Sequence, residues 1–100
     1  MSVAMYFKNP ISGEDEIMPL VGASELKAVW MPIVTTLDLH HLDYCFTAGL
    51  QIDCENRNDL LEEFKQLWSS LAPSEGKERC KAAIELISSD GPQLGSLYIG

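Results

Sequence analysis

The sequence is poor in cysteine, in basic residues and in long apolar runs, and each shortage excludes a class of protein. Cys45, Cys54 and Cys80 are an odd number of cysteines without a close pair, which does not suit a disulfide framework. The uncharged run Ala28–Leu37 is ten residues long, whereas a membrane-spanning helix needs about 18 apolar residues. Met1–Pro10 contains no apolar stretch of signal-peptide length. We therefore expect a reduced, cytoplasmic protein without a membrane span.

Basic residues are outnumbered: the chain has seven lysines and arginines against fifteen aspartates and glutamates, a formal net charge of −8. Residues 1–63 hold eleven of the acids and three of the bases, whereas residues 64–100 hold four of each. Nucleic acids and anionic membranes are bound through clustered lysine and arginine, so we expect neither as a direct partner. The acidic first two thirds of the chain suits a basic protein partner, and solubility alone is the other interpretation.

Motifs of enzymes and of metal sites are also scarce. The chain contains no glycine-rich phosphate loop, no zinc-protease helix motif and no serine-nucleophile turn motif. His40, His41, Cys45 and Cys54 are legitimate metal ligands, but only His41 and Cys45 have the spacing of a structural zinc site. A reactive cysteine needs an electropositive setting, and acidic residues surround Cys45 instead. We therefore predict no catalytic residue, no metal and no cofactor.

Two helices are predicted from apolar periodicity. The first begins at the capping residue Asn58 and ends near Ala72, where Pro73 forbids continuation. Its apolar stripe is formed by Leu60, Leu61, Phe64, Leu67, Trp68 and Leu71. The second helix begins after Ser74, and its stripe consists of Cys80, Ala83, Ile84 and Ile87. Both stripes are expected to face the core.

The rest of the chain predicts short strands and a broken helix. The expected strands are Val3–Lys8, Leu50–Cys54 and Leu94–Ile99. A helix capped by Ser24 should break or kink at Pro32 before a second piece that runs to Leu37. Residues 39–47 receive no assignment, and residues 13–16 and 73–76 are expected to be surface loops. The predicted fold is α+β in a single compact domain, residues 1–100, with about three strands and two to three helices packed on one face of the sheet.

The predicted site is a set of acidic residues with two aromatic anchors. Trp30 is an anchor because it lies at the expected helix break, and Tyr44 is the second aromatic. The partner-binding residues are Glu14, Asp15, Glu16, Trp30, Tyr44, Asp53, Glu55, Asp59, Glu62 and Glu63.

Three functions of different classes follow from these patterns. The favoured one is a small acidic protein-interaction domain, of which a bacterial immunity-type inhibitor that neutralises a basic toxin or nuclease is the specific form. The alternative is a homodimeric structural or regulatory subunit held together by Ala28–Leu37. The third is a small enzyme that uses His40, His41 and Cys45.

Overall fold

The computed structural model describes residues 2–8, 12–53, 55–88 and 97–100. Its elements in chain order are β1 (Val3–Lys8), β2 (Asp15–Val21), α1 (Ala23–Glu25), the π-helical turn η1 (Leu26–Trp30), α2 (Met31–Thr36), α3 (His40–Thr47), β3 (Leu50–Gln51), α4 (Arg57–Ser70), α5 (Glu75–Ser88) and β4 (Tyr98–Ile99). The α+β fold class is confirmed. The expected strand residues Cys54 and 94–96 lie outside the described residues.

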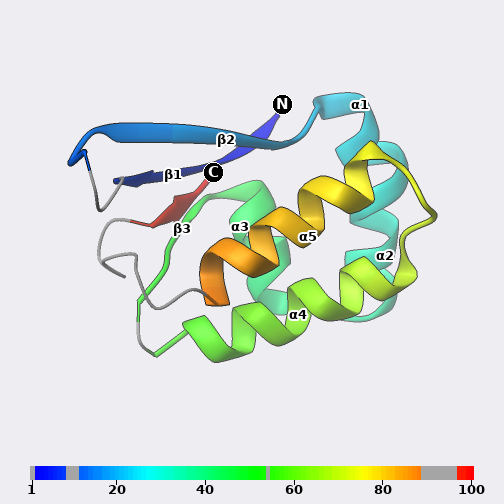
Figure 1. Ribbon diagram of the computed structural model, residues 1–100. Coiled ribbons are helices and arrows are strands. Elements are labelled where there is room, and N and C mark those ends of the chain that lie inside the picture. The colour runs from blue at the N-terminus through cyan, green and yellow to red at the C-terminus, as the bar shows by residue number, and fades with distance from the viewer. Residues whose placement is uncertain (1, 9–11, 54, 89–96) are drawn as a thin grey trace.

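The strands form one antiparallel sheet in the order β2-β1-β4-β3, and the helices lie on one side of it (Figure 1). β1 has the predicted bounds, whereas β2 is a strand that the sequence pattern does not reveal. Residues 15 and 16, expected in a loop, begin β2. Pro19 fits because β2 is an edge strand, where a missing N–H breaks no ladder bond on the solvent side.

The helical segment from Ala23 to Thr36 is continuous through Pro32, where a break or a kink was predicted. The irregularity takes the form of a π turn, Leu26–Trp30, just before the proline. In an α-helix the proline ring would meet the carbonyl of Ala28, and the chain widens to a π turn just before this point. The backbone N–H of Met31 accordingly donates to the carbonyl of Leu26. The turn places Leu26 and Trp30 in the core.

The chain reverses direction sharply after α2, and α3 then begins within residues 39–47, to which no structure was assigned from the sequence. Asp38 has a left-handed backbone with φ of 57°. Its N–H donates to the Thr35 carbonyl at 3.3 Å, and the N–H of Leu39 donates to the Val34 carbonyl at 3.0 Å. This pair of bonds is a Schellman motif, which ends a helix and turns the chain away.

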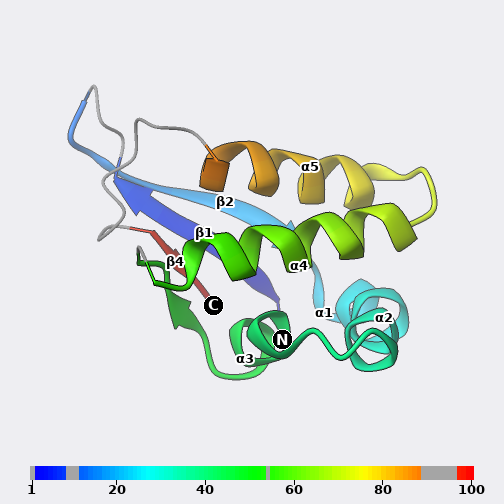
Figure 2. The ribbon, with the colours of Figure 1, turned by 90° about the horizontal axis from the view of Figure 1, so that it is seen from below.

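The two predicted helices form an antiparallel pair, α4 and α5, that covers the sheet together with α3 (Figure 2). Leu60, Phe64 and Leu67 of the predicted stripe are fully buried. α4 begins at Arg57 rather than Asn58, because hydrogen bonds of Asp53 and Asn56 form the turn that precedes the helix. α5 begins after Ser74 as predicted, and the Oγ of Ser74 accepts the Lys77 N–H at 3.2 Å. No helix in the described part of the chain is long and apolar enough to cross a membrane.

Candidate functional site

The predicted anchor Trp30 is wrong, because its side chain is fully buried. Its ring packs against Phe46 with centroids 5.7 Å apart, and Phe46 in turn contacts Phe64 at 6.4 Å. Leu26, Trp30 and Val34 lie four residues apart on one buried face of the continuous helical segment. Trp30 therefore belongs to the core and contacts no partner from this position.

The second predicted anchor, Tyr44, lies on the exposed side of α3 with 57% of its surface accessible. His40, Asp43 and Thr47 are exposed on the same helix. Tyr44 is thus available for a contact, and Asp43 places a carboxylate next to it in sequence.

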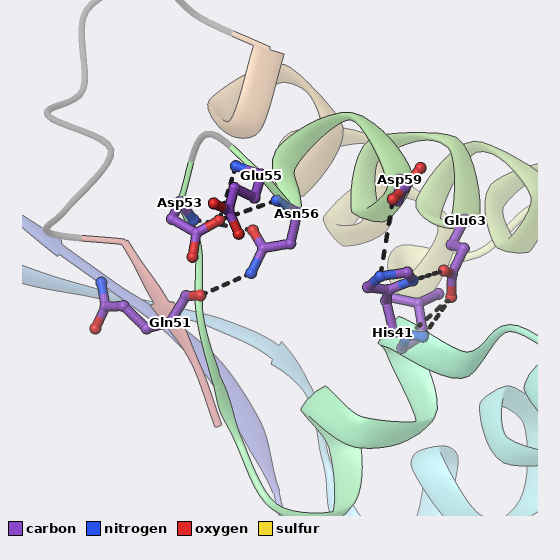
Figure 3. Close-up of polar contacts among 8 residues, drawn as sticks. His41, Gln51, Asp53, Glu55, Asn56, Asp59 and Glu63 are labelled. Carbon is purple, nitrogen blue, oxygen red and sulfur yellow. Dashed lines mark hydrogen bonds and ion pairs between the residues drawn. The ribbon is translucent and has the colours of Figure 1, made fainter.

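The turn that precedes α4 is closed by Asp53 and Asn56 (Figure 3). One oxygen of the Asp53 carboxylate accepts the backbone N–H groups of Glu55 and Asn56, each at 2.9 Å. The Asn56 side chain accepts the Asp53 N–H at 2.9 Å and donates to the Gln51 carbonyl at 3.0 Å. Asp53 thus has a structural role in addition to its exposed charge.

A cluster of His41, Asp59 and Glu63 joins α3 to α4 (Figure 3). Glu63 accepts the backbone N–H groups of His41 at 2.9 Å and Leu42 at 3.1 Å. Its other carboxylate oxygen contacts Nδ1 of His41, while Asp59 lies 4.0 Å from Nε2 of the same ring. The Glu63 side chain is only 12% exposed. The expectation that Glu63 faces a partner is therefore wrong, because its carboxylate satisfies the first N–H groups of α3.

The other predicted acids are at the surface. Asp59 and Glu62 each have 69% of the side chain exposed, and Glu62 lies 3.6 Å from Lys65. Glu55 is exposed at the start of α4. Glu14, Asp15 and Glu16 are exposed at the start of β2. Figure 1 shows that the start of β2 and the start of α4 lie at the same end of the molecule, away from α1 and α2.

The His/Cys set does not come together as one site. His40 lies 3.3 Å from Asp38, while His41 contacts Glu63 on another element. Burial, together with the nearby Glu63 carboxylate, raises the pKa of the Cys45 thiol to about 12, so the thiol stays protonated at neutral pH. Among the described residues, no group of three or more His, Cys, Asp or Glu side chains could hold a metal ion. Cys54 lies outside the described residues.

Sequence reasoning missed a row of exposed side chains on the helix-free side of the sheet. Tyr6 is paired across β1 with Ile17 of β2 on one side and with Tyr98 of β4 on the other. The signal was present in β1, where Val3 and Met5 alternate with positions that point the other way.

Comparison with protein-family models, with curated proteins and with solved structures finds no match to this chain.

Proposed function

We propose that the protein is a small acidic interaction domain that binds a cationic protein through its exposed carboxylates. The observation that carries the proposal is a surface on which exposed acids outnumber the nearby bases. Residues 53–63 contain five acids and one arginine, Arg57. Within the described ranges, no lysine or arginine side chain forms an ion pair with Glu14, Asp53 or Glu55. These carboxylates are therefore available to a partner.

The position of Arg57 supports the proposal. Its Nε donates to the Ile87 carbonyl at 2.8 Å, which directs the guanidinium toward α5. The carboxylate of Glu55, just before α4, and those of Asp59 and Glu62 on α4 are exposed in this part of the chain. Clustered charge of one sign attracts an oppositely charged protein over a distance and raises the rate of productive encounters.

An immunity-type inhibitor is the specific form of this proposal. A basic toxin or nuclease recognises an anionic substrate, and a set of exposed carboxylates can occupy the same basic surface. The domain would act in the cytoplasm, where such an enzyme would otherwise reach its substrate. The protonated, buried thiols of Cys45 and Cys80 are compatible with a reducing compartment.

The homodimer alternative has less support. Trp30 and Val34, in the middle of Ala28–Leu37, are buried within the chain itself. Val29 and Leu37 remain exposed by 42% and 40%, which is a small apolar area for a stable subunit interface.

Identification of the partner tests the proposal. The product of an adjoining reading frame with a basic C-terminal domain is the first candidate, and affinity capture followed by mass spectrometry supplies others. The expected result is a basic partner whose affinity falls as salt rises, since salt screens exposed charges. A partner with an acidic or neutral contact surface, or an affinity insensitive to salt, would contradict the proposal.

A further inference from the structure

The helix-free side of the sheet carries an exposed apolar row. The row consists of Tyr98, Tyr6 and Ile17, which are neighbours across β4, β1 and β2. Their exposed fractions are 37%, 40% and 64%. Figures 1 and 2 show the helices on the opposite side of these strands. Contiguous apolar side chains of this kind on a small protein are typical of interaction sites.

The two tyrosines are held in place before any partner arrives. Their ring centroids lie 5.9 Å apart. A Cβ at Gly49 would overlap the Tyr98 hydroxyl, and one at Gly100 would lie 2.6 Å from the Tyr98 ring. The Tyr98 ring therefore packs directly against the backbone of both glycines. A side chain that is already positioned loses less conformational entropy on binding.

Acidic residues lie beside the row, further along β1 and β2. Lys8 and Asp15 are opposite each other on the same side of the sheet as Tyr6 and Ile17, because they are two residues further along each strand. Glu14 precedes Asp15 and is also exposed. The acids outnumber the base here, so the local charge is complementary to a cationic segment.

On the other side of the row, two residues along the strands in the opposite direction, lies a hollow of about 540 Å³ whose lining includes Tyr6 and Ile17 as well as Ala4, Pro19 and Arg79. The guanidinium of Arg79 lies 2.8 Å from the Glu25 carboxylate and 3.6 Å from that of Glu75, and its Nε donates to the Leu20 carbonyl. Its positive charge is therefore matched within the chain and does not oppose a cationic partner.

We propose that this sheet face, defined by Tyr6, Ile17 and Tyr98, is the surface on which an arginine-bearing segment of the partner docks. The inference rests on the proposed function. A guanidinium plane stacks on a tyrosine ring through the cation–π interaction, and apolar side chains beside it pack against Ile17. Neighbouring basic side chains of the segment pair with Glu14 and Asp15. Glu14 and Asp15 are the acidic residues that adjoin this docking face.

The probe is a labelled peptide of alternating arginine and leucine. The same peptide with lysine in place of each arginine serves for comparison. The variant Tyr6→Thr with Ile17→Thr keeps good strand formers while it removes two of the three side chains of the row. The matched control is Val29→Ala with Leu37→Ala, which removes apolar side chains of similar exposure from the helical side. We expect the first variant to weaken arginine-peptide binding at least about tenfold and the control to change it less than about twofold.

Backbone amide chemical shifts of the unmutated protein provide a test that does not depend on a variant folding. Peptide addition should shift signals of β1, β2 and β4. Shifts confined to α3 and α4 around Tyr44, or equal effects of the two double variants, would overturn the docking face and leave a salt-sensitive cationic partner intact. No salt-sensitive binding of either peptide or of any basic protein would overturn the proposed function itself. A dimer that the Tyr6→Thr, Ile17→Thr variant dissociates would show that a second copy covers the face, and would also overturn the inference.

Discussion

Glu63 of α4 caps the neighbouring helix α3. Its carboxylate accepts the backbone N–H of His41 at a distance of 2.9 Å. The N-cap residue of α3, Leu39, offers no side-chain acceptor of its own. A carboxylate placed at a helix N-terminus also interacts favourably with the helix dipole. One acid of the predicted interaction set therefore stabilises the fold, whereas Asp59 and Glu62 on the same helix keep 69% of their side chains exposed.

Glu63→Ala should destabilise the protein by about 1 to 3 kcal/mol, because two backbone N–H groups of α3 lose their acceptor. The adjacent Glu62→Ala is the matched control. It removes an exposed carboxylate, and we expect a change within about 0.5 kcal/mol. Urea denaturation of both variants measures the difference. Equal stabilities would mean that Glu63 does not hold α3.

The stripe on α4 predicts a second effect on stability. Phe64 and Leu67 are fully buried, so replacement of either by Ala should cost about 2 to 5 kcal/mol of unfolding free energy. Gln66→Ala on the exposed side of the same helix is the control. Thermal melting that is unchanged in the Phe64 and Leu67 variants would contradict the assignment of this helix to the core.

Position 49 requires glycine for two reasons, its backbone conformation and the lack of space for a side chain. A pair of variants separates the two effects. Gly49 has φ of +84° and lies against the Tyr98 side chain, whereas Gly13 has φ of +73° with open space around it. Gly13→Ala should cost about 1 kcal/mol from the backbone alone, and Gly49→Ala should cost more because Tyr98 must also move. Denaturation midpoints compare the two. A Gly13 effect as large as the Gly49 effect would show that Tyr98 is not packed there.

The buried thiols predict a loss of stability at high pH. Burial raises the pKa of Cys45 and of Cys80 from an ordinary value of 9.0 to about 12. Between pH 9.0 and about 12 the unfolded chain loses these protons while the folded chain keeps them, so stability falls as pH rises. The slope is at most about 1.4 kcal/mol per pH unit for each thiol.

Lysines and tyrosines titrate in the same range, so the control is the variant Cys45→Ala with Cys80→Ala. Its unfolding free energy should fall less steeply above pH 9.0 than that of the unmutated protein, whatever its stability at neutral pH. Parallel pH profiles would contradict the thiol assignment.

Elements whose signals are local were predictable from the sequence. β1 has the predicted bounds, and α4 and α5 follow their apolar periodicity because each buries one continuous stripe. Ser74 caps α5 with an acceptor three residues from its donor, which a sequence pattern can show.

Elements that depend on distant residues were not predictable. α3 receives its cap from Glu63, 22 residues away from His41, so no local pattern marks its start. β2 contains Pro19 and begins with two acids, and it is a strand because β1 pairs with it. Trp30 was expected at a break in the helix, whereas the π turn keeps the helix continuous and Trp30 inside.

The same distinction applies to the candidate site. The exposed acids could be identified from charge counts alone, but the pairing partners of Glu63 and Asp53 are set by the tertiary fold. The row of Tyr6, Ile17 and Tyr98 joins three strands from the two ends of the chain. Its existence depends on strand order, which periodicity does not contain.

The association rate with the cationic partner, measured by stopped flow over a range of salt, tests the central claim most directly. Glu14→Lys with Glu16→Lys changes one acidic cluster, and Glu55→Lys with Glu62→Lys changes the other while it spares the contacts of Asp53 and Glu63. Glu78→Lys with Glu85→Lys, on the charge-balanced α5, is the control with the same change in net charge. Melting curves confirm that each variant is folded.

The Debye length falls from about 10 Å at 0.1 M salt to about 3 Å at 1 M, so exposed charges act mainly at low salt. We expect both cluster variants to associate more slowly than the unmutated protein at low salt, with rates that converge as salt rises, and the α5 control to change far less. Folded cluster variants with unchanged association rates and salt dependence, or a control that slows binding equally, would contradict the account.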